Sequence, residues 1–288
     1  MGYIPWKACI LMPVYNMKPE LLRASIMSAI RQTYPVDVFI LDDHSTDKRS
    51  LQMAHNILKI ESRREKRKET KRAERDPSIE PHVRLFKLLK DGSYNKKDFP
   101  TAGRVMNSGV EYAFAMGYHW FCIMGGDDIA LPDFAAACLG HAYKNDHSNL
   151  ISVDCRCLMQ LDQDSSYRQP FIAGERMGKP IWGSSPPWWK TCHAIMYKYP
   201  ETPDKPMTDW YVADWVREHK YDVEHIGAEN YVYVFHEKML SASIHHDRAA
   251  RDLAAVRDHI KGKKFRPEID KYWRYLIERG KQYKPGEY

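Results

Sequence analysis

The first sixty residues alternate between short apolar runs and amphipathic segments. The apolar runs at residues 8–16 (ACILMPVYN) and 36–41 (VDVFIL) have the length and composition of buried strands. The segments that follow them, residues 20–33 and about 48–60, have apolar side chains at helical spacing. Because strands and helices that alternate at this spacing need crossover connections, the sequence predicts an α/β fold with a mostly parallel sheet flanked by helices.

The same alternation continues further along the chain. Residues 83–89 (VRLFKLL) read as another strand, and residues 101–116 as an amphipathic helix that leads into a strand at Trp120. We therefore expect one α/β domain followed by a basic, helical C-terminal extension. The expected ranges are 1–247 for the domain, about 1–135 and about 136–247 for its two halves, and 248–288 for the extension.

The composition excludes two classes of protein. Of the 288 residues, 43% are hydrophobic and 28% are charged, which is typical of a globular chain and not of a disordered one. No apolar stretch reaches the roughly 20 residues of a membrane-spanning helix, and the N-terminus lacks the basic region of a signal peptide. We expect a cytoplasmic protein. Its formal charge of +6 suits a phosphate-rich substrate or an anionic surface and identifies neither.

Residues 61–76 (ESRREKRKETKRAERD) interrupt the apolar periodicity. They contain eight Lys or Arg and five Asp or Glu, and no large apolar side chain. A run of this kind is typical of a solvated helical extension with i,i+4 ion pairs and no face to bury. A nucleic-acid-binding patch is the alternative interpretation.

The stretch from Trp120 to Asp133 (WFCIMGGDDIALPD) joins an apolar strand to two glycines and two adjacent carboxylates, Asp127 and Asp128. Glycine lets a backbone turn sharply and approach a ligand closely. Two carboxylates at the end of a strand suit a hard cation such as Mg²⁺ or Mn²⁺. Glycine and aspartate are also ordinary turn residues, so an exposed turn without a metal is the alternative.

Three of these pieces, ILMPVYN, VFILDDHSTD and IMGGDDIALPD, resemble a family 2 glycosyltransferase in their order and spacing. The resemblance covers about residues 8–140 well and extends more loosely to about 245. It implies the GT-A fold, which is Rossmann-like, and an enzyme that uses a nucleotide-sugar donor. Ligands bind beyond the carboxyl ends of parallel strands, where all three motifs end.

The resemblance also implies roles for the first turn. Pro13, Tyr15 and Asn16 would contact the uracil and ribose of a UDP-sugar, and Asp42 or Asp43 would accept the uracil N–H. From the residues alone, the two aspartates could instead form an Asx-turn or cap the next helix.

Ser45 and Asp47 could serve that capping role in their place. In the helix at 101–116, Asn107 matches the family's Asn-x-Gly segment. Arg104, about one turn earlier, could contact a diphosphate or form a surface salt bridge.

The acidic turn departs from the family's DxD pattern. Gly125 stands at the position of the first Asp, and Asp127 matches the second, which the resemblance makes the metal ligand. Asp128 would act directly or through water. His236 resembles a C-terminal histidine of the family that reaches the metal or diphosphate, with His245 and His246 as competitors for that role.

The second half of the family domain supplies the acceptor site and a catalytic base. Asp209, in KPMTDWYVADW, matches the Asp of the family's Glu-Asp pair, whose Glu is missing here, and Asp214 is the reserve. An acid favoured by a helix dipole is the alternative role for Asp209. The tryptophans Trp182, Trp188 and Trp189 are candidates for acceptor binding because aromatic faces stack on sugars and nucleobases.

Three functions remain open from the sequence. The first is an inverting, metal-assisted transfer of a hexose-type unit from a UDP-sugar to a hydroxyl of a glycan or lipid-linked acceptor. The second is the same chemistry on a hydroxylated base of DNA, suggested by the basic segments and the tryptophans. The third is an inactive GT-A domain that acts as a binding module.

Overall fold

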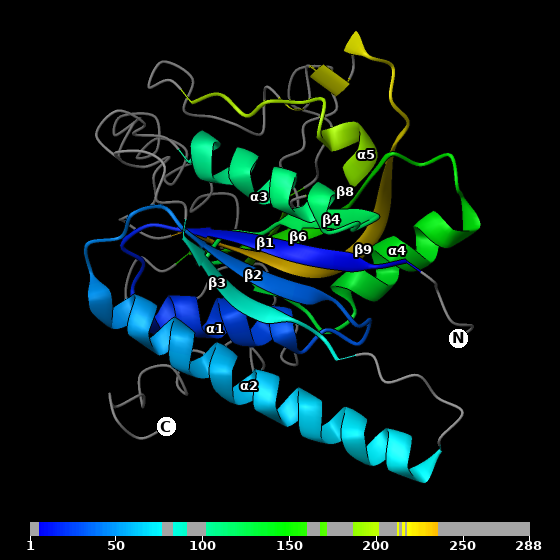
Figure 1. Cartoon of the computed structure of the whole chain (residues 1–288). Helices are drawn as coiled ribbons and strands as arrows, with labels where there is room; N and C mark the ends of the chain where they lie inside the picture. The colour runs from blue at the N-terminus through cyan, green and yellow to red at the C-terminus, as the bar shows by residue number, and fades with distance from the viewer. Residues whose placement is uncertain are drawn as a thin grey trace.

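The fold is taken from a computed structural model of the chain (Figure 1). The structure describes residues 6–76, 83–90, 102–159, 168–171, 187–201, 212, 215–216 and 218–235. The C-terminal extension predicted over 248–288 lies outside the described residues.

The described strands form one nine-stranded sheet, in the order β3-β2-β1-β4-β8-β6-β9-β5 with β7 paired to β6. The strands are β1 (Ala8–Val14), β2 (Asp37–Asp42), β3 (Phe86–Lys90), β4 (Trp120–Ile123), β5 (Ile129–Ala130), β6 (Leu150–Met159), β7 (Arg168–Phe171), β8 (Trp188–Lys190) and β9 (Val223–Phe235). Strands β1, β2, β3, β4, β6 and β9 run in one direction, whereas β5, β7 and β8 run against them. The predicted mostly parallel sheet is confirmed.

Five helices are described, and they cover both faces of the sheet. They are α1 (Pro19–Ile30), α2 (Lys48–Arg75), α3 (Gly103–Ala115), α4 (Phe134–Lys144) and α5 (Thr191–Ala194). Helices α1 and α2 lie on one face, and α3 and α5 on the other (Figure 1). Two apolar clusters fill the layers between the sheet and its helices.

The parallel half of the sheet brings the three motifs together. In the register of the sheet, Val14 of β1 lies opposite Asp42 of β2, and Leu11 of β1 lies opposite Ile123 of β4. The turns that follow these three strands therefore lie at one edge of the sheet. This is the edge at which parallel α/β sheets bind ligands.

Helix α2 joins the helix predicted at 48–60 to the charged run at 61–76 in one continuous element. The solvated helical extension is confirmed, but the prediction that the run has no face to bury is wrong. Glu65 is buried, and Arg84 donates to both of its carboxylate oxygens at 2.8 Å. The same guanidinium donates to the carbonyl of Ile30, so a buried ion pair fastens α2 to α1. The i,i+4 pairs are also not found among the described residues, where the ion pairs of the run are Arg64–Glu61 and Arg72–Glu69 at i,i+3.

None of the described helices is both long and apolar enough to cross a membrane.

Candidate functional site

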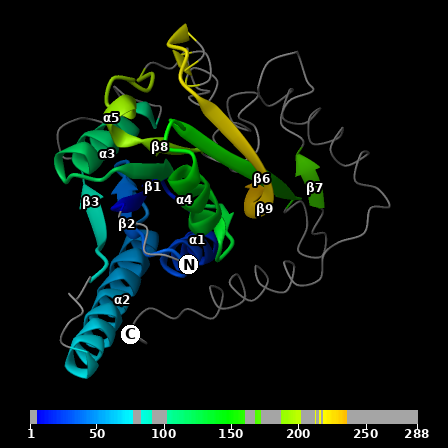
Figure 2. The ribbon, with the colours of Figure 1, turned by 90° about the vertical axis from the view of Figure 1, so that its right-hand side faces the viewer.

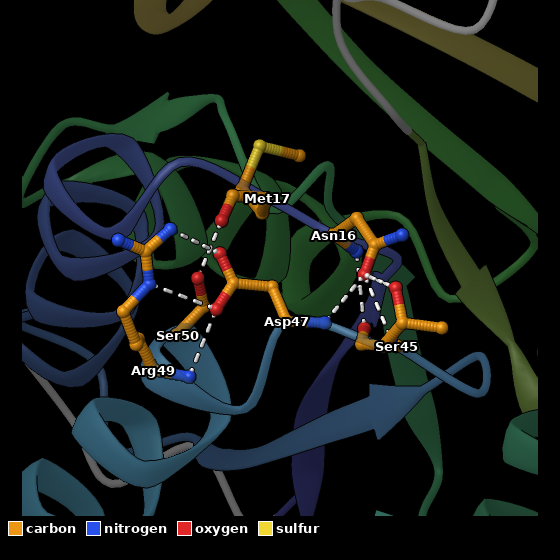
Figure 3. A network of polar contacts seen from close by, with 7 residues as sticks. Asn16, Met17, Ser45, Asp47, Arg49 and Ser50 are labelled. Carbon is orange, nitrogen blue, oxygen red and sulfur yellow. Dashed lines mark hydrogen bonds and ion pairs between the residues drawn. The ribbon is translucent and has the colours of Figure 1, made fainter.

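The turns after β1 and β2 are joined through the side chain of Asn16. Its Oδ1 accepts hydrogen bonds from the backbone N–H of Thr46 at 2.8 Å, the Thr46 hydroxyl at 3.1 Å and the backbone N–H of Asp47 at 3.0 Å. The backbone N–H of Asn16 donates in turn to the hydroxyl of Ser45 at 3.1 Å (Figure 3). Asn16 has a φ of 46°, a left-handed conformation that asparagine tolerates better than most residues.

The turn after β2 uses its acids to shape the backbone. Oδ1 of Asp42 accepts the backbone N–H of Ser45, three residues further on, at 2.9 Å, so this carboxylate bonds the turn locally, as the structural alternative for the residue expects. Asp47 caps α2 through the N–H of Arg49 (Figure 3). The side chains of Asp42 and Asp43 are 5% and 2% exposed, so only a small part of either faces solvent. Their uracil-binding role stays a prediction.

The carboxylates of Asp127 and Asp128 converge on the space beside Gly125. A Cβ atom at Gly125 would lie 2.7 Å from Oδ1 of Asp127 and 2.7 Å from Oδ2 of Asp128. A side chain at this position would therefore displace at least one carboxylate. Gly126 packs closely on β1, since a Cβ there would lie 3.1 Å from Val14 and 3.4 Å from the carbonyl oxygen of Pro13. The acidic turn and the first turn are direct neighbours.

Polar side chains of α1 and of the turn that follows it fix the backbone of the acidic turn. The hydroxyl of Ser25 donates to the carbonyl of Gly125 at 2.9 Å. One turn further along α1, the hydroxyl of Ser28 accepts the N–H of Ala130 at 3.1 Å. Gln32 donates to the carbonyl of Leu131 at 2.8 Å. These buried bonds explain why polar residues occur on the covered face of α1.

Asp128 has a buried hydrogen-bond donor on β9. The hydroxyl of Tyr231 donates to Oδ2 of Asp128 at 2.7 Å, and the two side chains are 0% and 4% exposed. Burial, and then the charge of the Asp128 carboxylate, raise the pKa of the Tyr231 phenol well above its usual range. The phenol therefore stays protonated and the carboxylate stays its acceptor. No sequence signal distinguishes Tyr231 from the other aromatic residues of its strand.

The residues of the acidic turn fit a divalent cation only in part. Among the described residues, no group of three or more His, Cys, Asp or Glu side chains is placed to bind a metal. Asp127 and Asp128 supply two carboxylates. Because Mg²⁺ is often bound by one or two protein carboxylates together with substrate phosphates and water, this pair suits a cation that a diphosphate helps to ligate.

The structure gives Asn107 a supporting contact. Asn107 is 5% exposed, and its amide donates to the carbonyl of Tyr199 and to the carboxylate of Glu201, while its Oδ1 accepts the N–H of Tyr199. Arg104 lies 3.8 Å from the same Glu201, as the salt-bridge alternative expects. A Cβ at Gly103 would lie 1.9 Å from the carbonyl oxygen of Pro200, so α3 packs tightly on this segment. Asn107 holds residues 199–201 against α3.

The prediction that Trp188 and Trp189 bind an acceptor is wrong for this arrangement. They are 0% and 1% exposed and point to opposite faces of β8, into the two apolar clusters. Trp188 packs on Phe134 and Trp189 on Phe121. Core packing explains both rings. The remaining predicted residues Trp182, Asp209, Asp214 and His236 lie outside the described residues.

Sequence comparison assigns the N-terminal part of this fold. Residues 9–76, from β1 to the end of α2, match the family model described as Glycosyl transferase family 2. This match covers about a quarter of the chain and confirms the predicted resemblance to family 2 glycosyltransferases over these residues. No curated protein matches the chain by sequence.

Solved structures confirm the fold. Residues 1–349 of S. aureus TarS match with a TM-score of 0.53 and 12% identity, over 95% of this chain and 71% of that one. The mannosyltransferase PcManGT from Pyrobaculum calidifontis, in complex with GDP-Man and Mn²⁺, matches with a TM-score of 0.55 and 13% identity, over 96% and 74% of the two chains. TarS in complex with UDP-GlcNAc matches with a TM-score of 0.50 and 12% identity, over 95% and 66%. These similarities identify the GT-A fold.

Proposed function

We propose that the protein transfers a sugar from a UDP-sugar to an acceptor hydroxyl with inversion at the anomeric carbon. The observation that carries the proposal is the convergence of Asp127 and Asp128 beside the turns of β1 and β2. An acidic pair at the ligand-binding edge of a parallel sheet suits a divalent cation that also binds the diphosphate of a nucleotide sugar. TarS with UDP-GlcNAc and PcManGT with GDP-Man and Mn²⁺ support a donor and a cation of this kind.

The donor's nucleoside would lie across the first two turns. Tyr15 is 47% exposed at the end of β1, so its ring can stack on a base. Asp42 or Asp43 would accept the uracil N–H, and Pro13 and Asn16 would shape the ribose side. Arg104, 38% exposed beside Glu201, would be a cation for the diphosphate.

Asp128 compensates for the aspartate that the family's DxD pattern has at position 125. Its carboxylate turns back to within 2.7 Å of the point where a side chain of residue 125 would begin. Asp127 and Asp128 would then bind Mn²⁺ or Mg²⁺ together, with His236 as a further ligand. Such an ion would stabilise the negative charge of the departing diphosphate.

Asp209 is the proposed base. Its carboxylate would take the proton of the acceptor hydroxyl while that oxygen forms a bond to the anomeric carbon and the bond to the diphosphate breaks. Asp214 is the reserve for this role. The acceptor would be a hydroxyl of a glycan or lipid-linked molecule, with a hydroxylated base of DNA as the second candidate.

Nucleotide binding tests the donor and the cation together. We expect UDP and UDP-GlcNAc to raise the melting temperature by several degrees in the presence of Mn²⁺, and much less in excess EDTA, because binding stabilises the folded state by mass action. The same measurement with GDP and GDP-Man shows whether the site prefers uracil or guanine as the nucleobase. Asp127→Asn should lose the Mn²⁺-dependent part of the shift in melting temperature. Asp146→Asn, which removes an acid from an exposed turn, should keep this part of the shift. An equal shift in EDTA would refute the metal role.

Product formation separates the enzyme from a binding module. We expect release of UDP from a UDP-sugar in the wild-type protein, and its loss by at least a hundredfold in Asp209→Asn with UDP binding unchanged. Full turnover in Asp209→Asn together with a loss of UDP release in Asp214→Asn would assign the role of catalytic base to Asp214. A wild-type protein that binds UDP but neither transfers nor hydrolyses any nucleotide sugar would support the binding module.

A further inference from the structure

The second half of α2 extends beyond the sheet (Figures 1 and 2). One side of this part of the helix is strongly cationic. Six exposed basic residues line a hollow of about 740 Å³ along this part of the helix, together with Asp76. We call them the cationic stripe: Arg64, Arg67, Lys68, Lys71, Arg72 and Arg75. No role in the proposed transfer involves these residues.

The cationic stripe continues the apolar side of the same helix. Met53 and Ile57 are buried against the sheet, and helical steps of three and four residues from them lead through Glu61 to Arg64 and Lys68. The core-facing side of α2 itself continues to the buried Glu65 and Glu69, and the stripe lies beside it, in line with Met53 and Ile57. Arg64 lies sixteen residues beyond Lys48, or about 24 Å along the axis, so the stripe is remote from the turn at the start of α2.

The acidic residues of this segment form ion pairs with Arg64 and Arg72 of the stripe but not with its middle. Glu65 is buried and paired with Arg84, which is outside the stripe. Glu69 is 3% exposed and lies 3.8 Å from Arg72, and Glu61 is paired with Arg64. In the part of the chain that the structure describes, no carboxylate forms an ion pair with the middle of the stripe, which consists of Arg67, Lys68 and Lys71.

The stripe has the composition and dimensions of a phosphate-binding surface. From Arg64 to Arg75 it spans roughly 17 Å of helix axis, and duplex DNA presents about one negative charge per 1.7 Å of its own axis. Four of its six cations are arginines. One planar guanidinium group can bind two oxygens of the same phosphate at once. We infer that the cationic stripe of α2 binds the phosphodiester backbone of a nucleic acid.

Two other occupants fit less well. A helix that binds a bilayer surface presents apolar or aromatic side chains next to its cations, and the stripe has none. Residues 248–288 of this chain contain twelve Lys or Arg and six Asp or Glu, so their net charge would be repelled.

Binding to labelled 20-base-pair DNA, measured by fluorescence anisotropy with the full chain, tests the inference. We expect the triple variant Arg67→Gln, Lys68→Gln, Lys71→Gln to bind at least tenfold more weakly at 50 mM salt. The slope of log affinity against log salt should also fall by roughly two to three, since each phosphate contact contributes about 0.9. Duplex RNA and single-stranded DNA in parallel show which phosphodiester is preferred.

The matched control removes the same charge from another side of the helix. Lys59, Arg63 and Lys66 are exposed on α2 outside the stripe, and their triple change to glutamine should weaken binding less than threefold. All six positions are exposed, so melting curves should show both variants folded. Equal losses in the two triple variants would overturn the inference, as would no detectable wild-type binding at 50 mM salt. Tighter, stripe-dependent binding to phosphatidylserine vesicles than to DNA would overturn the choice of partner.

UDP binding by thermal shift provides an independent readout in the same samples. It should be unchanged in both triple variants, because the stripe is remote from the nucleotide turns. Loss of DNA binding with UDP binding intact supports the stripe even if the proposed transfer fails.

Discussion

The hydroxyl of Tyr231 donates a hydrogen bond to Oδ2 of Asp128 across 103 residues of sequence. Tyr231 belongs to β9, which also pairs with β5 directly after the acidic turn. The proposed metal-binding carboxylate therefore takes its orientation from the second half of the chain. The two predicted halves are structurally coupled at this point.

Removing the Tyr231 hydroxyl should weaken the acidic turn. We expect Tyr231→Phe to lower the free energy of unfolding by about 1–3 kcal/mol, because a buried carboxylate loses a donor, and to weaken Mn²⁺-dependent UDP binding. Urea unfolding and calorimetric titration measure the two effects. Tyr118→Phe is the matched control, since Tyr118 donates to buried Asp37 at 2.5 Å away from the acidic turn. A comparable loss of stability with unchanged UDP binding is expected there. Unchanged Mn²⁺ affinity in Tyr231→Phe would show that the bond is only structural.

A methyl group at Gly125 should separate the two carboxylates. Gly125→Ala places a carbon 2.7 Å from an oxygen of each, so we expect Mn²⁺-dependent UDP binding to fall at least tenfold. Gly140→Ala is the control, because no atom lies within 4 Å of a Cβ there. Gly140 is inside α4, so alanine should stabilise the protein by roughly 0.5–1 kcal/mol. Nucleotide binding that survives Gly125→Ala would exclude a joint role of Asp127 and Asp128.

Asn16 allows the contributions of its side chain and its backbone to be separated. Both Asn16→Gly and Asn16→Ala remove the acceptor of three hydrogen bonds and should weaken UDP binding. Alanine must also adopt the left-handed φ of 46°, which costs roughly 1–2 kcal/mol. Urea unfolding should therefore find Asn16→Ala the less stable of the two. The reverse order would indicate that the turn changes conformation in the variants.

The stability of the β6–β9 region should depend on pH through Glu224. Its partial burial acts to raise the pKa of the carboxyl, but hydrogen bonds from Ser148 and His141 and the nearby His147 lower it on balance. A carboxyl whose pKa is lowered by folding stabilises the native state above its unfolded pKa, near 4.5, and this stabilisation is lost as the pH falls through the lower native value.

We therefore expect Glu224→Gln to cost about 1–2 kcal/mol near pH 6, with the difference from wild type shrinking as the pH falls below the unfolded pKa near 4.5 and through the lower native value. Unfolding curves across this range measure it. Glu111→Gln is the control, because Glu111 is an exposed partner of Lys198 and should cost less than about 1 kcal/mol. A cost for Glu224→Gln that stays constant down to pH 3 would contradict the assignment.

Local sequence patterns predict the first half of the fold well because its elements depend on nearby residues. Apolar runs define β1, β2 and β4, and Pro19 opens α1. The ends of the elements are less predictable. The predicted helix at 20–33 stops at Ile30, since Gln32 and Thr33 bond to residues 131–133 instead of continuing it.

The errors concern contacts between distant parts of the chain. Trp188 and Trp189 are buried because β8 inserts between β4 and β6. No local sequence pattern predicts that β8 pairs with these two strands. Asn107 likewise bonds to residues 199–201, more than ninety positions away. Residue type alone does not distinguish an aromatic ring in the core from one that stacks on a ligand.

The three bonds at Asn16 bear on the entropy of ligand binding. Two loops that moved independently would each have to be ordered when a nucleotide bound, and that ordering would subtract from the affinity. Here the turn after β1 and the turn after β2 are already fixed to each other by one amide oxygen. A nucleotide that binds across them meets a preorganised surface, and most of its contact energy remains available as affinity.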